Sequence, residues 1–135
     1  YAHELALTLI RNSGIIHFGD NEKIYNKLPD FVKEFLTGLP TAFDETHLLS
    51  GYPGEHIVIA ARKGTIWYVA GINALAKPLN LNLDGSVIKS DDITIKFITD
   101  SPEVKNQFTC FKKTINSKYF NVQIMPYGGF VGIIQ

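Results

Sequence analysis

The densest group of polar side chains that could do chemistry is the run Asp44-Glu45-Thr46-His47. Its two carboxylates could act as a general acid and base, or as ligands of a metal ion. Adjacent residues on a strand point to opposite faces, so Asp44 and Glu45 can serve one site only where the backbone bends. A small free-standing enzyme would also need a pocket in which one carboxylate converges with His47. We favour a structural role, in which one carboxylate pairs with a strand arginine such as Arg62 or caps a turn.

Other catalytic and metal-binding patterns are absent from the sequence. Zinc sites bring paired ligands a few residues apart, whereas the histidines here are widely spaced and only one cysteine is present. No Gly-x-Ser-x-Gly elbow occurs, and Gly128-Gly129 precedes a strand pattern rather than a helix that could hold a phosphate. Cys110 stands between Phe108 and Phe111, as expected for a small core residue. The histidines are His3, His17, His47 and His56.

Aromatic residues suggest a different function, sugar binding. A sugar presents C–H faces that stack on aromatic rings. Trp67 and Tyr68 are the candidate sugar-contact residues, with Tyr52, Tyr119 and Tyr127 as further members of such a platform. The favoured alternative is that Trp67 is the core tryptophan of a β-sandwich. Exposure decides between the two, because a platform needs coplanar rings that are open on one face.

Composition excludes several classes of protein. Lys and Arg number 13 and so do Asp and Glu, which gives no positive field for nucleic acid. No run approaches the roughly 18 apolar residues that span a bilayer. A single cysteine cannot form an internal disulfide. The chain begins at Tyr1 inside a helical pattern, so we expect a cut piece whose export signal, if any, lies upstream.

The first forty residues predict two or three helices. Ala2, Leu5, Ala6, Leu9 and Ile10 form one apolar stripe, and a stop is expected at Gly14. A second helical region runs from about residue 21 to residue 38, capped by Asp20 or Asn21 and broken into two short helices at Pro29. The second of these carries Phe31, Val32, Phe35, Leu36 and Leu39 on one face. These stripes need a covering surface, either the strands that follow or a helical layer outside this chain.

From residue 41 onward the apolar period changes to two, which predicts strands. Lys63-Gly64 and Pro126-Tyr127-Gly128-Gly129 are the turn signals. Together they predict an α+β chain, with a helical segment over residues 1–40 and an antiparallel sandwich of seven or eight strands over residues 41–135. The predicted strand ranges are 55–61, 65–72, 79–83, 93–97, 119–125 and 130–134.

Several blocks of the sequence resemble the C-terminal end of glycoside hydrolase family 97. The Asp-Glu-Thr and Arg-Lys-Gly-x-x-Trp-Tyr blocks are the most specific. The resemblance covers nearly the whole chain but thins between Ala74 and Asn121. Phe43 stands where the family usually has Trp, and Tyr127 replaces a Gly. The matching residues are Pro40 to Thr46, Leu49, Gly51, Gly54-Glu55, Ala61 to Gly64, Trp67-Tyr68, Gly71 and Pro126 to Phe130.

The resemblance implies a large parent enzyme. The family comprises calcium-dependent, exo-acting α-glucosidases and α-galactosidases, with an N-terminal β-sandwich, a (β/α)8 barrel and a C-terminal sandwich described as an oligomerisation domain. Residues 3–39 are similar to the last helical part of the barrel. The family's catalytic carboxylates and calcium ligands lie upstream, so no catalytic or metal-ligating residue is carried over to this chain.

The resulting expectation is a non-catalytic structural domain. Its partners would be the catalytic barrel of the same parent and, in a homodimer, a second copy; no nucleic acid and no membrane are expected. Calcium would belong to the parent, with no cofactor in this chain, and the family resemblance implies a periplasmic or secreted bacterial protein. The alternative is an independent carbohydrate-binding module. The family-motif residues given a structural role are Asp44, Glu45, Thr46, Arg62, Gly64, Trp67, Tyr68, Gly128, Gly129 and Phe130.

Overall fold

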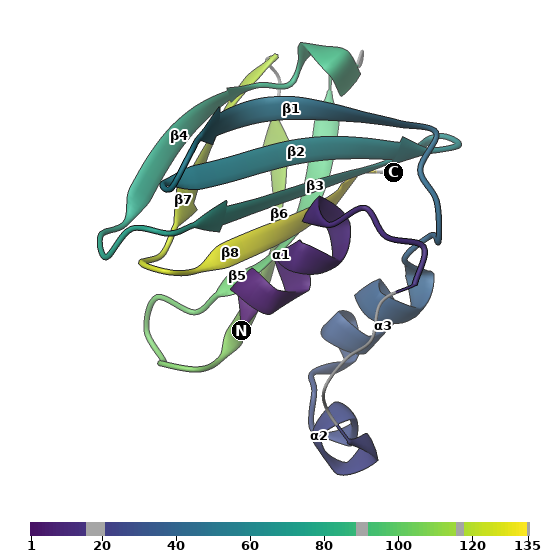
Figure 1. The fold of residues 1–135 in the computed structure, drawn as a ribbon, viewed down its shortest axis with the longest axis vertical. Coiled ribbons are helices and arrows are strands. Elements are labelled where there is room, and N and C mark those ends of the chain that lie inside the picture. Colours follow the sequence, from purple (N-terminus) through teal and green to yellow (C-terminus); the bar gives the residue numbers. More distant parts are fainter. Residues whose placement is uncertain (16–20, 89–91, 116–117, 135) are drawn as a thin grey trace.

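The computed structural model describes residues 1–15, 21–88, 92–115 and 118–134. Within these ranges three α-helices precede eight strands, as Figure 1 shows. The helices are α1 (Ala2–Ile10), α2 (Glu22–Asn26) and α3 (Asp30–Gly38). The strands are β1 (Glu45–Tyr52), β2 (His56–Lys63), β3 (Ile66–Asn73), β4 (Leu79–Asp84), β5 (Ile93–Asp100), β6 (Phe108–Ile115), β7 (Tyr119–Ile124) and β8 (Gly129–Ile134). The predicted α+β chain is confirmed.

The helix boundaries follow from a few residues. The side chain of Asn21 accepts a hydrogen bond from the Ile24 amide (3.2 Å), which caps α2. Pro29 precedes α3 as its N-cap, so the predicted break there is confirmed. The stop predicted at Gly14 is wrong, because α1 ends at Ile10. Asn12 takes the left-handed conformation (φ 44°) and ends the helix early, since Asn tolerates that region better than most residues. The other cap candidate, Asp20, lies outside the described residues.

The strands form two antiparallel sheets. The larger has the order β1-β2-β3-β8-β5-β6, and the smaller pairs β4 with β7. The predicted turn between β2 and β3 is confirmed, with Lys63 opposite Ile66 and Gly64 at φ 59°. That positive φ suits glycine, which has no Cβ to clash with the backbone. No boundaries were predicted for two of the strands, β1 and β6. These are the two edge strands of the large sheet.

Two hydrophobic cores lie on the two faces of the six-stranded sheet. One fills the space between the two sheets and includes Trp67, Phe97 and Phe130. The other lies beneath the helices and joins Leu5 and Leu9 of α1, together with Val32 and Phe35 of α3, to the opposite face of the sheet. The molecule therefore has three layers: helices α1 and α3, a six-stranded sheet and a two-stranded sheet, with α2 projecting away from the sheets (Figure 1).

Helix α1 sits directly on β8. A Cβ added at Gly129 would lie 2.7 Å from the Cα of His3 and 2.8 Å from the carbonyl oxygen of Ala2, so only glycine fits there. Asp100 of β5 fixes the same contact, because its carboxylate accepts from the amides of Ala2 (2.8 Å) and Gly129 (3.1 Å). Of the two covering surfaces that the sequence left open for the helices, the strands of this chain are the one that covers α1.

A buried amide ties the ends of three strands together. Asn73, at the end of β3, is fully buried. Its side-chain nitrogen donates to the carbonyl oxygens of Lys77 (2.8 Å) and Met125 (3.1 Å), and its side-chain oxygen accepts from the amide of Leu75 (2.9 Å). The loop before β4 and the end of β7 are therefore held against β3, which fixes the position of the small sheet.

Candidate functional site

The acidic run ahead of β1 is organised around Arg62. The Arg62 Nε donates to a carboxylate oxygen of Glu45, and Nη1 lies 3.6 Å from Asp44. Asp44 also accepts from the Gly64 amide (2.8 Å) and from the Lys63 ammonium (3.0 Å). The expected pairing of a carboxylate with Arg62 is confirmed, and both carboxylates reach it. Asp44 precedes the first residue of β1, so strict strand alternation does not apply to it.

Hydrogen bonds and charge keep both carboxylates ionised. The Gly64 amide, followed by Lys63, lowers the pKa of Asp44 below its ordinary value. The hydrogen bond from His47, followed by Arg62, lowers the pKa of Glu45. Glu45 and His47 do converge, at 2.7 Å, and the His47 ring lies 5.9 Å from Trp67. A carboxylate with a lowered pKa is a poor general acid at neutral pH, so this cluster is best described as a structural ion-pair network that closes the β2–β3 turn.

The structure does not support Trp67 and Tyr68 as sugar-contact residues. They are 8% and 6% exposed and face opposite sides of the six-stranded sheet. Tyr68 packs edge-on against Phe43 and its hydroxyl donates to the Gly38 carbonyl (3.4 Å), while burial raises the pKa of its phenol. Neither ring offers a free face to a sugar. The exposed Tyr52, Tyr119 and Tyr127 lie on β1, on β7 and in the β7–β8 turn, so they belong to three separate elements.

The histidines and the cysteine considered as metal ligands or nucleophiles form no such site in the described part of the chain. Over the described ranges, no group of three or more His, Cys, Asp or Glu side chains is close enough to hold a metal ion. His56 contacts the hydroxyl of Ser50 (2.8 Å), and His17 lies outside the described residues. Cys110 is a half-buried thiol that packs beneath the helices. No helix in the described part of the chain has the length and apolar character needed to cross a membrane.

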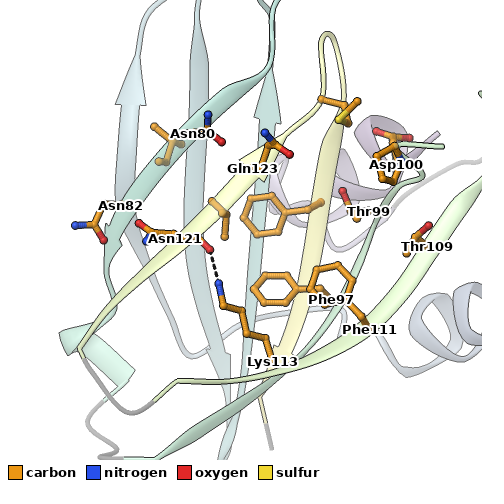
Figure 2. Close-up of a pocket in the computed structure, with 15 residues that line it drawn as sticks. Asn80, Asn82, Phe97, Thr99, Asp100, Thr109, Phe111, Lys113, Asn121 and Gln123 are labelled. Atoms are coloured by element: carbon orange, nitrogen blue, oxygen red, sulfur yellow. Dashed lines mark hydrogen bonds between the residues drawn. The ribbon is translucent and has the colours of Figure 1, made fainter.

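A further cavity was not predicted from the sequence. It is a groove of about 760 Å³ where the six-stranded sheet extends past the small sheet, between β7 and β6 (Figure 2). Asn and Gln residues of β4 and β7, whose side chains stand on the outer face of the small sheet, border one side; Phe97 and Phe111 line the other. We refer to it as the β6–β7 groove. It is lined by Asn80, Leu81, Asn82, Phe97, Thr99, Asp100, Pro102, Thr109, Phe111, Lys113, Asn121, Val122, Gln123, Met125 and Phe130.

The sequence carried part of the signal for this groove. The alternation of leucine with Asn80 and Asn82 already placed these amides on the polar face of a strand. Their proximity to Asn121 and Gln123 depends on the pairing of β4 with β7, in which Asn80 lies opposite Gln123 and Asn82 opposite Asn121. That register is a long-range property, so the group of four amides emerges only in the folded chain.

A second concave surface lies on the helix side of the sheet. It has a volume of about 420 Å³ and is almost entirely apolar. Leu48 and Tyr52 of β1 are 66% and 62% exposed there, beside the half-buried Ile57 and Ile72. Ile57 and Ile72 pack against the same core as α1, so this apolar surface continues the face that α1 covers. Exposed apolar surface of this kind is typical of a contact with another protein surface.

Fold and surfaces together define an antiparallel β-sandwich accessory domain with a helical layer on one face. The family model for the glycosyl-hydrolase 97 C-terminal, oligomerisation domain matches residues 42–135. The chain therefore belongs to this family, which confirms the resemblance seen in the sequence.

Relatives with curated names are long proteins. A probable retaining α-galactosidase of Streptomyces bingchenggensis is 39% identical over 70 residues, which are 52% of this chain and 11% of that protein. A retaining α-galactosidase of Bacteroides thetaiotaomicron is 39% identical over 69 residues, 51% of this chain and 10% of that protein. The chain thus spans about a tenth of the length of these relatives.

Solved structures match almost the whole chain. A β-arabinopyranosidase superposes with a TM-score of 0.84 and 29% identity, over 98% of this chain and 20% of that one. A glycoside hydrolase family 97 enzyme from Pseudoalteromonas sp. strain K8, in complex with acarbose, has a TM-score of 0.79 and 18% identity, over 99% of this chain and 22% of that one. The second likeness concerns the fold alone. Both matches include the helices, so the same helix-on-sheet arrangement recurs inside larger proteins.

Proposed function

We propose that this chain is the non-catalytic C-terminal domain of a calcium-dependent, exo-acting α-glycosidase of the α-galactosidase or α-glucosidase type. The observation that carries the proposal is the close packing of α1 on β8. At this contact Gly129 allows the backbones to approach, and Asp100 accepts hydrogen bonds from the amides of Ala2 and Gly129. Such a contact would hold the sandwich rigidly against the end of a catalytic barrel. The names of the α-galactosidase relatives and the family match support the same proposal.

The hydrolytic step would belong to the rest of the parent. Glycosidases use two carboxyl groups that flank the scissile bond, one of them with a raised pKa. The acidic pair that the sequence offers, Asp44 and Glu45, has lowered pKa values and is engaged by Arg62 and Lys63. Calcium binding and exo action are likewise assigned to upstream residues, on the strength of the family resemblance.

The partner surface is assigned to the helix side of the sheet. The apolar surface around Leu48 and Tyr52 continues the face covered by α1, so a barrel that carries α1 as its last helix would reach it directly. Burying one leucine side chain is worth roughly 1.5–3 kcal/mol. Contacts on this face would therefore hold the barrel, and the subunits of a dimer would meet through the assembled parent.

The proposal is tested on the full-length parent enzyme. Leu48→Asp places a charge in the apolar contact, whereas Asn82→Asp, on the opposite side of the molecule, is the matched control. Leu48→Asp should lower the melting temperature or the sedimenting mass of the parent, and Asn82→Asp should change neither. Equal behaviour of the two variants would refute the assigned surface. Turnover of an aryl α-galactoside by residues 1–135 alone would refute the non-catalytic role.

A further inference from the structure

We propose that the β6–β7 groove is a binding site for a neutral saccharide, separate from the catalytic site of the parent. The proposal rests on the chemistry of the groove and goes beyond the structural function proposed above. Its volume of about 760 Å³ lies within the range of small-ligand sites in proteins. It exists because the small sheet has only two strands and leaves the end of the large sheet uncovered.

Phenyl rings give the groove an apolar wall. Phe97 and Phe111 stack with their ring centroids 5.4 Å apart and their planes 27° apart. Phe97 is buried, while Phe111 is 44% exposed and presents ring surface to solvent. A pyranose has C–H faces that pack on such a ring, and removal of this apolar contact from water favours binding. Figure 2 shows both rings beside Lys113 on the β5–β6 side of the groove.

Four side-chain amides stand on the outer face of the small sheet and border the groove. Asn80 faces Gln123 across the small sheet and Asn82 faces Asn121, so the four form a compact group. No hydrogen bond to these amide side chains is found in the described part of the chain. Each amide offers two donors and an acceptor, a combination that matches hydroxyl groups, which also donate and accept. The amides are therefore free to bind a polyhydroxylated ligand.

The charges of the groove favour an uncharged ligand. Its lining holds one cation, Lys113, and one anion, Asp100. Both already bind backbone groups: the Lys113 ammonium donates to the Asn121 carbonyl (3.0 Å), and Asp100 accepts from the amides of Ala2 and Gly129. Neither charge is left to select a phosphate, a carboxylate or an amine. Among small ligands, a neutral sugar combines the required hydroxyls and C–H faces.

The groove also lies on the accessible side of the domain. It opens beside the two-stranded sheet, whereas α1 covers the opposite face of the six-stranded sheet (Figure 1). A partner seated on the helix side would leave the groove open. Saccharide binding and attachment to the barrel therefore use separate surfaces, so an experiment can disprove one of the two proposals and leave the other intact.

The test is an NMR titration of the ¹⁵N-labelled chain with melibiose and with maltose, and with sorbitol as a polyol that lacks a pyranose ring. We expect shifts of the amide signals of groove residues with a dissociation constant of about 1 mM. The double variant Asn80→Ala/Gln123→Ala should weaken binding by about tenfold, because it removes two sets of hydrogen-bonding groups at exposed positions. Asn26→Ala, an exposed amide on α2, is the matched control and should bind like the wild type.

A second variant separates stacking from hydrogen bonding. Phe111→Leu keeps apolar volume but removes the flat ring, and should also weaken binding while the spectrum stays dispersed. The proposal is overturned by an absence of groove shifts at about 50 mM of either disaccharide, by equal shifts with sorbitol, or by binding unchanged in the double variant. It is also overturned if an extended peptide, added as a strand along β6 or β7, binds the groove while both sugars do not.

Discussion

Gly129→Ala should loosen α1 from the sheet. The added methyl carbon would lie 2.7 Å from the Cα of His3, 2.8 Å from the carbonyl oxygen of Ala2 and 2.9 Å from the amide nitrogen of His3. All three atoms belong to the backbone, so no side chain can rotate away to relieve the overlap. The first turn of α1 must move outward, which also stretches the bonds that Asp100 makes to Ala2 and to residue 129.

The expected loss in the free energy of unfolding is about 1–3 kcal/mol, the usual range for an extra methyl group in a packed interface. Urea unfolding gives this value, and hydrogen exchange of the α1 amides reports where the loss occurs. Exchange should accelerate in α1, particularly at Leu5 and Ala6, more than in the central strand β3. Local loosening is expected because α1 packs against the sheet through one apolar face.

Gly38→Ala is the matched control. A Cβ at Gly38 would meet nothing within 4 Å, and this residue ends helix α3. Alanine there should leave the free energy of unfolding unchanged or raise it by up to about 1 kcal/mol, because it restricts the unfolded chain. If Gly129→Ala were as stable as the wild type and protected α1 equally well, the close contact between α1 and β8 would be refuted.

Leu9→Ala should lower the free energy of unfolding by about 2–5 kcal/mol, because Leu9 is 1% exposed. Leu48 is 66% exposed, so Leu48→Ala should change the free energy of unfolding of this chain by less than about 1 kcal/mol. Urea unfolding of both would contradict the burial pattern if the losses were equal. Asn73→Leu should cost about 1–3 kcal/mol by leaving buried carbonyls without a donor, and an unchanged urea midpoint would argue against that network. The lowered pKa of Asp44 gives stability that is complete above about pH 4 and is lost as pH falls through the folded-state pKa. Thermal melts of Asp44→Asn should therefore show a smaller acid-induced loss than the wild type, and parallel curves would exclude this contribution.

Short sequence patterns were enough to predict the helices and strands in which one face is buried along the whole element, and the turns between them. Pro29 divides α2 from α3 because a proline cannot continue a helix that reaches it, and Gly64 makes the β2–β3 turn because the turn needs a positive φ. Residues 79–84 alternate leucine with polar residues because one face of β4 is covered by the large sheet. These features depend on neighbours close in sequence, so they are visible without the fold.

The strands that sequence reasoning left without boundaries are the edge strands. β6 has its groove face and its helix face only partly covered, and a run from Phe111 to Thr114 is exposed. An edge strand with two open faces has no need for strict apolar alternation, so the period of two is lost. β1 carries a bulge between Leu48 and Ser50, which shifts its side chains from one face to the other and breaks the pattern.

By itself the sequence predicted the helix–strand order, the ion pair between the acidic run and Arg62, and the family, because each rests on short patterns. The tertiary structure alone decided which surfaces are available. It buried Trp67 and Tyr68 on opposite faces of one sheet and left Phe111 exposed beside four amides that are distant in sequence. The physical reason is that β8 inserts between β3 and β5 and confines the second sheet to β4 and β7. That long-range pairing is set by the packing of the whole chain. The same packing forms the groove, the apolar surface and the contact between α1 and β8.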